Sequence, residues 1–321
     1  ISEAAKYTLQ FINQTQRSVF LTGKAGTGKT TLLREIIETT HKNTVVVAPT
    51  GIAALNAGGV TIHSMFQLPF SGFIPSHTAE SQFSETMKFE NKDSLRRHFK
   101  MNGLKKSVIR NMELLIIDEV SMLRADLLDA MDYMMQTVRK KATPFGGVQV
   151  LFIGDLLQLP PVVRDEEWRT LRNYYKGKFF FHSHVIQQYP PLYIELSKIF
   201  RQTDSSFIAV LNNLRNNQIT PEDVQVLNQY VKPDFDLKAN KGYITLTTHN
   251  AKADAMNAQA LEDLKGELIT YTPEIIGDFP EKIYPVEYNL QLKLGAQIMF
   301  VKNDLAFEKN YFNSSTFPRR K

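Results

Sequence analysis

The segment GKAGTGKTT, residues 23–31, is the clearest sign of chemistry in this sequence. It fits the pattern G-x-x-x-x-G-K-S/T and lies between the apolar run VFLT and the helix-like run TLLREIIE, the context that a phosphate-binding loop requires. Glycines let backbone N–H groups wrap a phosphate chain, and the amino end of the following helix adds partial positive charge. The segment predicts a nucleotide-binding loop made of Gly23, Ala25, Gly26, Thr27, Gly28, Lys29, Thr30 and Thr31.

Within this loop, Lys29 can reach the β- and γ-phosphate oxygens and Thr30 can ligate Mg²⁺, so ATP and Mg²⁺ are the expected cofactors. Two acids, Asp118 and Glu119, end the apolar run LLIIDE. Packing alone does not explain them, because burying an unpaired carboxylate costs free energy. We expect Asp118 to bind the metal with Thr30, and Glu119 to be the base that orients the attacking water. A helix-start signal without catalysis is the alternative for this acid pair.

A third motif, GDLLQLPPV, places Asp155 and Gln158 directly after the apolar run VQVLFI. The carboxyl ends of parallel strands meet at one edge of a sheet, so Gln158 is expected near the γ-phosphate. Its neutral amide could bond a phosphate oxygen or the attacking water, and Pro160 and Pro161 would stiffen the chain that follows. A proline-rich turn that only leaves the strand is the alternative.

The apolar runs before these motifs are typical of buried parallel strands. They are SVFLTG, TVVVAPTG, LLIIDEV and VQVLFIGD, and helix-like segments such as residues 3–12 and 124–139 lie around them. Helices cover both faces of a parallel sheet, so its strands need no polar alternation. We expect a doubly wound α/β domain over residues 1–185.

One segment interrupts this alternation. Residues 67–110 are rich in Pro, Ser and Phe and then turn basic, which indicates an insertion in the first domain. Its basic residues could contact a duplex or an exiting strand and so help to separate strands. A solvated helix face explains them equally well.

A second α/β domain is predicted over residues 190–313. It would begin with PPLYIEL and continue with helices near residues 205–216 and from Pro221, the strand YITLTTH and a helix over residues 251–264. After the strand-like AQIMFVKN it lacks strands needed to complete it, and residues 314–321 form a tail of unassigned role.

Composition excludes several classes of protein. The 321 residues include 43% hydrophobic and 22% charged residues, which is ordinary for a folded chain. With no cysteine, the chain has no disulfide or thiolate zinc site, which fits an intracellular setting. No apolar run approaches the ~20 residues that cross a bilayer. The net charge of +5 permits nucleic-acid binding without establishing it.

The combination of GKAGTGKTT, APTGIAALN with TIHSMF, LLIIDEVSM, RKKATPFGGVQ leading into GDLLQLPPV, and IFRQTD resembles the Pif-type DNA helicases, relatives of RecD-like enzymes in helicase superfamily one. The resemblance covers residues 1–313. It implies two RecA-like domains with ATP in the cleft between them, single-stranded DNA across their top and movement in the 5′ to 3′ direction. It also implies that Arg201 of IFRQTD reaches the γ-phosphate, where a guanidinium stabilises the transferring group. A surface helix cap is the alternative for Arg201.

The resemblance also implies contacts with single-stranded DNA. These contacts are Pro49, Thr50, Gly51, Thr61, His63, Ser64 and Phe66 in the first domain, and Thr248, His249, Asn250 and Asn257 in the second. Hydroxyls and backbone N–H groups can bond phosphates, and Phe66 could stack on a base. Each has an ordinary alternative, because short hydroxyl residues often cap helices and a phenylalanine usually belongs to a core.

The expected activity is therefore that of an ATP-dependent 5′ to 3′ DNA helicase. Its partners would be single-stranded DNA and single-strand/duplex junctions, with G-quadruplexes and RNA–DNA hybrids as further candidates, no membrane, and a monomeric state. Roles in replication, repair and telomere maintenance come with the resemblance.

Two departures from the family pattern bear on this expectation. Ala5 stands where many members carry an adenine-reading glutamine, with Gln10 nearby but out of register. The family's late β-barrel and its His-Lys-Ser-Gln-Gly and Ala-Leu-Ser-Arg motifs do not occur in this sequence. The alternative function is an ATP-binding module that grips single-stranded DNA without translocating.

Overall fold

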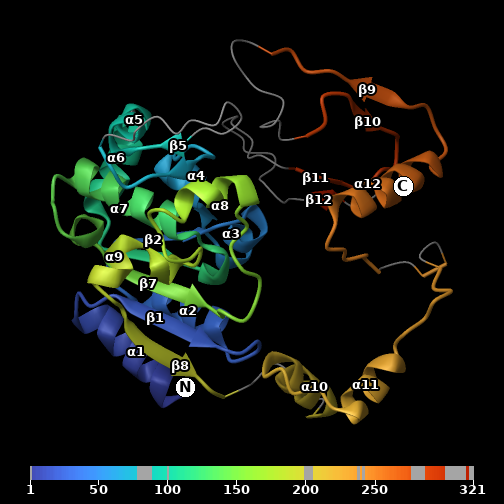
Figure 1. Ribbon diagram of the computed structural model, residues 1–321, viewed down its shortest axis with the longest axis horizontal. Coiled ribbons are helices and arrows are strands. Elements are labelled where there is room, and N and C mark those ends of the chain that lie inside the picture. The colour runs from blue at the N-terminus through green and yellow to red at the C-terminus, as the bar shows by residue number, and fades with distance from the viewer. Residues whose placement is uncertain are drawn as a thin grey trace. The chain divides into compact units, whose positions relative to one another are not determined.

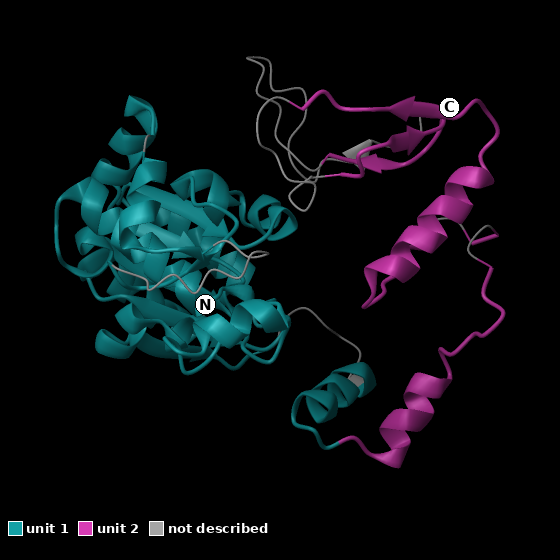
Figure 2. Cartoon of the chain, turned by 45° about the horizontal axis from the view of Figure 1, so that its top comes forward, with its two compact units in different colours: residues 1–218 teal, residues 219–321 magenta. Residues whose placement is uncertain are grey.

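The structure is a computed structural model that describes residues 2–77, 89–99, 101–198, 205–236, 239–240, 243–275, 286–300 and 316–317 (Figure 1). The chain divides into two compact units, unit 1 over Ile1–Gln218 and unit 2 over Ile219–Lys321 (Figure 2). Unit 1 contains the phosphate-loop segment and both acidic motifs.

Unit 1 is organised around a six-stranded sheet in the order β3-β2-β6-β7-β1-β8, with parallel pairings throughout. Its strands are β1 (Val19–Gly23), β2 (Thr44–Ala48), β3 (Val60–Thr61), β6 (Leu114–Ile117), β7 (Gln149–Gly154) and β8 (Leu192–Leu196). Every residue of β1, β6 and β7 is buried, as expected for central parallel strands. The predicted α/β class is confirmed, and the four predicted apolar runs form β1, β2, β6 and β7.

Helices cover both faces of this sheet (Figure 1). The helices described in unit 1 are α1 (Glu3–Gln14), α2 (Lys29–Thr39), α3 (Gly51–Ala57), α4 (Ile62–Phe66), α5 (Lys92–Arg96), α6 (Gly103–Asn111), α7 (Ala125–Arg139), α8 (Asp165–Leu171), α9 (His184–Gln188) and α10 (Ser205–Arg215), with 3₁₀ turns η1 (Arg97–Phe99), η2 (Val120–Met122), η3 (Pro144–Gly147) and η4 (Phe180–His182). Successive residues of β1 separate the two cores. Leu21 packs with Ile12 of α1, whereas Phe20 packs in the cluster that contains Leu128 of α7.

The boundary between the predicted domains differs from the observed one. PPLYIEL was predicted to open the second domain, but β8 is the edge strand of the first sheet and pairs with β1, with Leu192 opposite Val19. Unit 1 then continues through α10 to Gln218. A β-prone run predicts a strand, but the strand that it pairs with depends on contacts between residues far apart in the chain.

The described part of the predicted insertion belongs to unit 1 and packs against α7. It contains the parallel pair β4 (Gly72–Phe73) and β5 (Phe89–Glu90), followed by α5, η1 and α6. The Phe73 N–H donates to Asp126 Oδ2 of α7 at 3.0 Å. Leu95 of α5 and Ile109 of α6 are buried in the same cluster as α7. This segment therefore builds part of the core beside the sheet.

The described residues of unit 2 contain helices α11 (Pro221–Asn228) and α12 (Asn250–Glu262) and two antiparallel pairs. The pairs are β9 (Ile269–Tyr271) with β10 (Leu290–Leu292), and β11 (Ile298–Met299) with β12 (Thr316–Phe317). The predicted helices of this region are confirmed. The predicted strand YITLTTH is wrong: residues 243–249 are exposed and pair with no described strand. A β-prone run needs a pairing partner to satisfy its backbone groups.

Within the described ranges, none of the helices combines the length and apolar character that crossing a membrane demands.

Candidate functional site

Three neighbouring strands bring the predicted catalytic motifs to one edge of the sheet. β1 ends at Gly23, β7 is followed by Asp155, and β6 is followed by Asp118. β7 pairs in parallel with both β1 and β6, so the carboxyl ends of the three strands lie side by side. The ends of β2 and β3, which carry Thr50 and Thr61, continue the same edge. Doubly wound sheets bind their ligands at this edge.

The loop after β1 is strongly curled. Gly26 and Gly28 have φ values of 79° and 89°, in the left-handed region that favours glycine. A Cβ at Gly23 would lie 2.6 Å from Thr27 Oγ1, so a larger residue does not fit there. Thr27 is buried, and its hydroxyl donates to the Lys24 carbonyl at 2.9 Å. These contacts hold the predicted phosphate loop at the amino end of α2.

The Lys29 amine lies within this loop. It donates to the carbonyl oxygens of Gly23 at 2.6 Å and Lys24 at 3.0 Å. Burial lowers the pKa of Lys29, while nearby carboxylates, Asp155 first among them, oppose this effect. An amine held by two neutral carbonyl oxygens can exchange them for the charged oxygens of a phosphate. The other predicted loop residues are Thr30, which is half-buried, and Ala25 and Thr31, which are exposed.

The acid pair lies on a tight turn between β6 and η2. The Asp118 N–H donates to the Val47 carbonyl at 2.9 Å and so extends the pairing of β6 with β2. The Glu119 N–H donates to Asp118 Oδ1 at 2.9 Å. Glu119 has φ 53°, a left-handed conformation that costs a non-glycine residue about 1 kcal/mol. Such strain is often found at functional sites.

Both acids are less acidic than usual. Burial raises the pKa of Asp118, and the hydrogen bond from the Glu119 N–H and the charge of Lys29 partly offset this increase. Burial also raises the pKa of Glu119, the charges of Asp118 and Asp155 raise it further, and Lys29 lowers it. A carboxylate with a raised pKa accepts a proton more readily, which suits the role predicted for Glu119.

Asp155 collects several hydrogen-bond donors. Its side chain is 2% exposed, and Oδ1 accepts the Leu157 N–H at 3.1 Å. Oδ2 accepts Gln158 Nε2 at 3.3 Å and Arg215 Nη1 at 2.5 Å. Burial opposes ionisation of Asp155, but the bonds from Arg215 and the Leu157 N–H outweigh it and lower the pKa. The predicted γ-phosphate residue Gln158 is therefore anchored to an ionised carboxylate.

Sequence patterns do not single out Arg215 or its neighbour Asn212, which accepts Lys24 Nζ at 3.0 Å. Both contacts join α10 to residues far away in the chain, and no local motif marks them. Arg201, the arginine predicted to reach the γ-phosphate, lies outside the described residues.

Thr50 and Thr61, two predicted DNA contacts, also cap helices. The Thr50 hydroxyl accepts a backbone N–H of α3, and the Thr61 hydroxyl accepts the Ser64 N–H of α4, each at 3.3 Å. A hydroxyl that accepts one bond keeps its proton for donation, so both remain able to bond a phosphate. The neighbouring predicted contacts are Pro49 and Gly51, which are half-buried, and Ser64, which is exposed.

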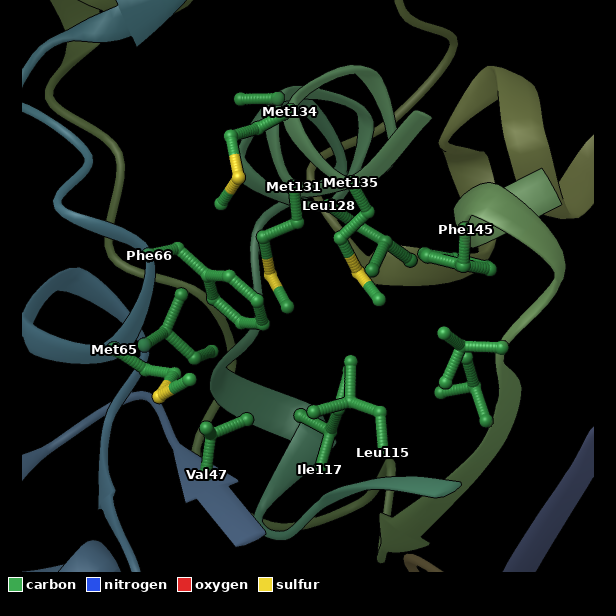
Figure 3. Packing of buried hydrophobic residues seen from close by; sticks show 14 of the residues in the cluster. Val47, Met65, Phe66, Leu115, Ile117, Leu128, Met131, Met134, Met135 and Phe145 are labelled. Carbon is green, nitrogen blue, oxygen red and sulfur yellow. The ribbon is translucent and has the colours of Figure 1, made fainter. Parts of the chain in front are cut away.

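The prediction that Phe66 stacks on a base is wrong. Phe66 is fully buried, and Figure 3 shows its ring directed into the hydrophobic cluster beside Met131 of α7. Ile62, Met65 and Phe66 recur at the spacing that places side chains on one face of a helix, and α4 buries all three. Phe70, four residues further on, is 84% exposed.

His63 forms an aromatic pair with this exposed phenylalanine. The rings of His63 and Phe70 are stacked, with centroids 4.2 Å apart and planes 7° apart. Burial and the charge of Arg124 lower the pKa of His63 to about 4, against the opposing effect of Asp126. His63 is therefore neutral at pH 7, and it supports the Phe70 ring from one side.

The predicted DNA contacts of unit 2 are exposed. Thr248, His249, Asn250 and Asn257 lie on or just before α12. The Thr248 hydroxyl lies 2.8 Å from His249 Nδ1, and His249 precedes the first residue of the helix. Their polar groups are accessible, and their contact with DNA stays a prediction.

Comparison with known proteins agrees with this geometry. Residues 4–225 match the PIF1-like helicase family. The chain is 31% identical over 296 residues to the human ATP-dependent DNA helicase PIF1. The aligned region covers 89% of this chain and 41% of the human protein. It thus spans less than half the length of this relative.

Solved structures give the same result. A structure that describes DNA unwinding at forked duplex DNA by two coordinating Pif1 helicases has a TM-score of 0.83 and 40% identity, covering 98% of this chain and 70% of that one. Pif1 from Bacteroides in complex with ADP-AlF3 and single-stranded DNA has a TM-score of 0.81 and 38% identity, covering 98% and 68%. Sequence, fold and site geometry together show that this chain belongs to the PIF1-like helicase family.

Proposed function

We propose that this chain hydrolyses ATP to move in the 5′ to 3′ direction along single-stranded DNA and so acts as a DNA helicase. One observation carries the proposal. The phosphate loop, the pair Asp118–Glu119 and the pair Asp155–Gln158 follow three adjacent parallel strands, and the candidate DNA residues of unit 1 lie at or after the ends of the next two strands of the same edge. A nucleotide and a DNA strand bound there would contact one continuous surface, which suits a motor that couples hydrolysis to movement.

The residues of this edge fit Mg²⁺ and ATP. Lys29 would bind the β- and γ-phosphates after leaving the carbonyl oxygens of Gly23 and Lys24. The Thr30 hydroxyl and the Asp118 carboxylate supply the oxygen ligands that Mg²⁺ prefers, and few protein ligands are usual for a Mg²⁺ ion that enters with phosphates. When bound, Mg²⁺ neutralises charge on the phosphate oxygens.

Three side chains would act on the hydrolysis step. Glu119 would take the proton of the attacking water on its carboxylate, since burial has already made that carboxylate more basic. Gln158, tied to Asp155, would present its amide to the γ-phosphate or the water. Arg201 would stabilise the charge of the transferring group.

The DNA grip would combine phosphate contacts with one stacking platform. Thr50 and Thr61 retain hydroxyl protons for phosphates, and Lys105 Nζ, which donates to the Ser64 carbonyl at 2.5 Å, adds a positive charge beside Ser64. The open face of Phe70 would stack on a base, because base–aromatic stacking tolerates every base. Sequence-independent contacts of this kind are what a translocating enzyme needs.

We extend the proposal to the setting of the enzyme. Its substrates would be single-strand/duplex junctions, with G-quadruplexes and RNA–DNA hybrids as further candidates, and it would work as a monomer inside cells. Thr248, His249, Asn250 and Asn257 would contact the same DNA strand. Replication, repair and telomere maintenance are the processes that such substrates serve.

Two assays on the intact protein test the proposal. Single-stranded DNA should stimulate ATP hydrolysis, and Arg201→Ala should lose most of that stimulation while it keeps nucleotide binding. A duplex with a 5′ overhang should be unwound, whereas one with a 3′ overhang should not. ATP hydrolysis without strand displacement would instead support a module that grips DNA without translocating.

A further inference from the structure

Helix α10 contacts the predicted phosphate site on two sides. Asn212 Oδ1 accepts Lys24 Nζ of the phosphate loop at 3.0 Å. Arg215 Nη1 donates to Asp155 Oδ2 at 2.5 Å. Asn212 and Arg215 are three positions apart and therefore lie on the same face of the helix. One face of α10 thus contacts both the loop after β1 and the residue after β7.

The Arg215–Asp155 ion pair is shielded from water. The side chain of Arg215 is 20% exposed and that of Asp155 is 2% exposed. Removing one partner of such a pair leaves an uncompensated buried charge, unlike the loss of a surface salt bridge.

Asp155 also fixes the position of Gln158. Its Oδ2, which accepts Arg215, accepts Gln158 Nε2 as well, and its backbone carbonyl accepts the Gln158 N–H at 2.9 Å. Gln158 is otherwise exposed, so these bonds limit the freedom of its amide. Any group that holds the Asp155 carboxylate in place therefore also holds Gln158.

We propose that Arg215 is a positioning residue for the γ-phosphate step of ATP hydrolysis. It neutralises and orients Asp155, and Asp155 in turn orients the Gln158 amide. The inference rests on the proposed function and adds a residue outside its motifs. If Arg215 only attached α10 to the rest of unit 1, the contact made by Asn212 would matter equally.

The test compares Arg215→Gln with Asn212→Ala, which removes the other contact of the same helix. Binding of ADP alone and of ADP with aluminium fluoride, a mimic of the transferring phosphoryl group, is measured by calorimetry on the intact protein. Arg215→Gln should weaken binding of the mimic by at least about tenfold and binding of ADP by less than about threefold. Asn212→Ala should change neither by more than about threefold. Unchanged affinity of Arg215→Gln for the mimic, or equal losses in the two variants, would overturn the proposal.

This binding test does not depend on turnover. A parent protein that binds the mimic but does not hydrolyse ATP refutes the proposed hydrolysis, while the comparison of variants still decides the role of Arg215. If Arg215→Gln does not fold, Arg215→Lys takes its place, since it keeps the charge but loses the planar guanidinium. Arg215→Lys should also weaken binding of the mimic more than binding of ADP, by a smaller factor than Arg215→Gln. If Arg215→Lys binds the mimic and ADP as tightly as the parent does, the proposal is overturned.

Turnover provides a second readout. In Arg215→Gln, kcat for ATP should fall while KM stays near that of the parent. Because Arg215 acts through Gln158, adding Arg215→Gln to Gln158→Ala should lower kcat little further. Additive losses would show that Arg215 does not act through Gln158 and would overturn the proposed route.

Discussion

Replacing phenylalanine by leucine at positions 66 and 70 should affect two different properties. Phe66→Leu should lower stability, and Phe70→Leu should lower the affinity for single-stranded DNA. Phe66→Leu changes a ring that is fully buried, and Phe70→Leu changes one that is 84% exposed. Both substitutions remove an aromatic ring and keep an apolar side chain. The pair therefore separates a role in the core from a role in stacking on DNA.

The expected magnitudes follow from burial and stacking. Truncating a buried phenylalanine to alanine costs about 3–5 kcal/mol, and the smaller change Phe66→Leu should destabilise unit 1 by roughly 1 kcal/mol or more. Phe70→Leu should change the free energy of unfolding by less than about 0.5 kcal/mol, because its side chain is 84% exposed. A lost base stack is worth about 1–3 kcal/mol, so the affinity of Phe70→Leu for single-stranded DNA should fall roughly five- to 150-fold.

Denaturant unfolding and fluorescence anisotropy with a labelled oligothymidine measure the two effects on the same samples. Phe66→Leu should bind DNA like the parent under conditions in which it is folded. The reasoning fails if Phe70→Leu binds DNA with the affinity of the parent. It also fails if Phe66→Leu is as stable as the parent but binds DNA weakly, because Phe66 would then reach the DNA.

Further predictions concern the nucleotide, the backbone grip and pH. Lys29→Ala should abolish tight binding of Mg-ATP, whereas Glu119→Gln should bind Mg-ATP without hydrolysing it. Calorimetry measures the binding and a phosphate-release assay measures the hydrolysis. Normal ATP hydrolysis by Glu119→Gln would show that Glu119 is not the base. Affinity for single-stranded DNA should fall steeply between 50 and 200 mM salt and depend little on base sequence, whereas a flat salt response would argue against phosphate contacts. The pKa of His63 is lowered from 6.5 to about 4 in the folded protein, so between these pH values the histidine binds a proton in the unfolded chain but not in the folded one. The free energy of unfolding should therefore fall as the pH drops from 6.5 towards 4. At about 1.36 kcal/mol per pKa unit this amounts to about 3 kcal/mol at most, and the loss should be smaller in His63→Gln when urea unfolding is measured across this range.

The amino-acid sequence alone predicts the parts of this protein whose physical cause is local. The conformation of GKAGTGKTT follows from its own residues, because its glycines permit left-handed turns and the next residues start a helix. The four apolar runs of the first sheet are recognisable because a strand buried on both faces has no polar positions. Asp118, Glu119 and Asp155 stand out because charged residues directly follow such runs.

The tertiary structure decides what depends on residues distant in the chain. It places β8 in the first sheet beside β1, since a strand pattern does not specify its partner, and it leaves residues 243–249 without a strand. It buries Phe66 and exposes Phe70, because the packing of α4 against α7 determines which ring meets solvent. It also brings Arg215 to Asp155, a contact across 60 positions that no spacing rule contains. Local patterns determine which chemistry the chain can perform, and long-range packing determines which side chains reach it.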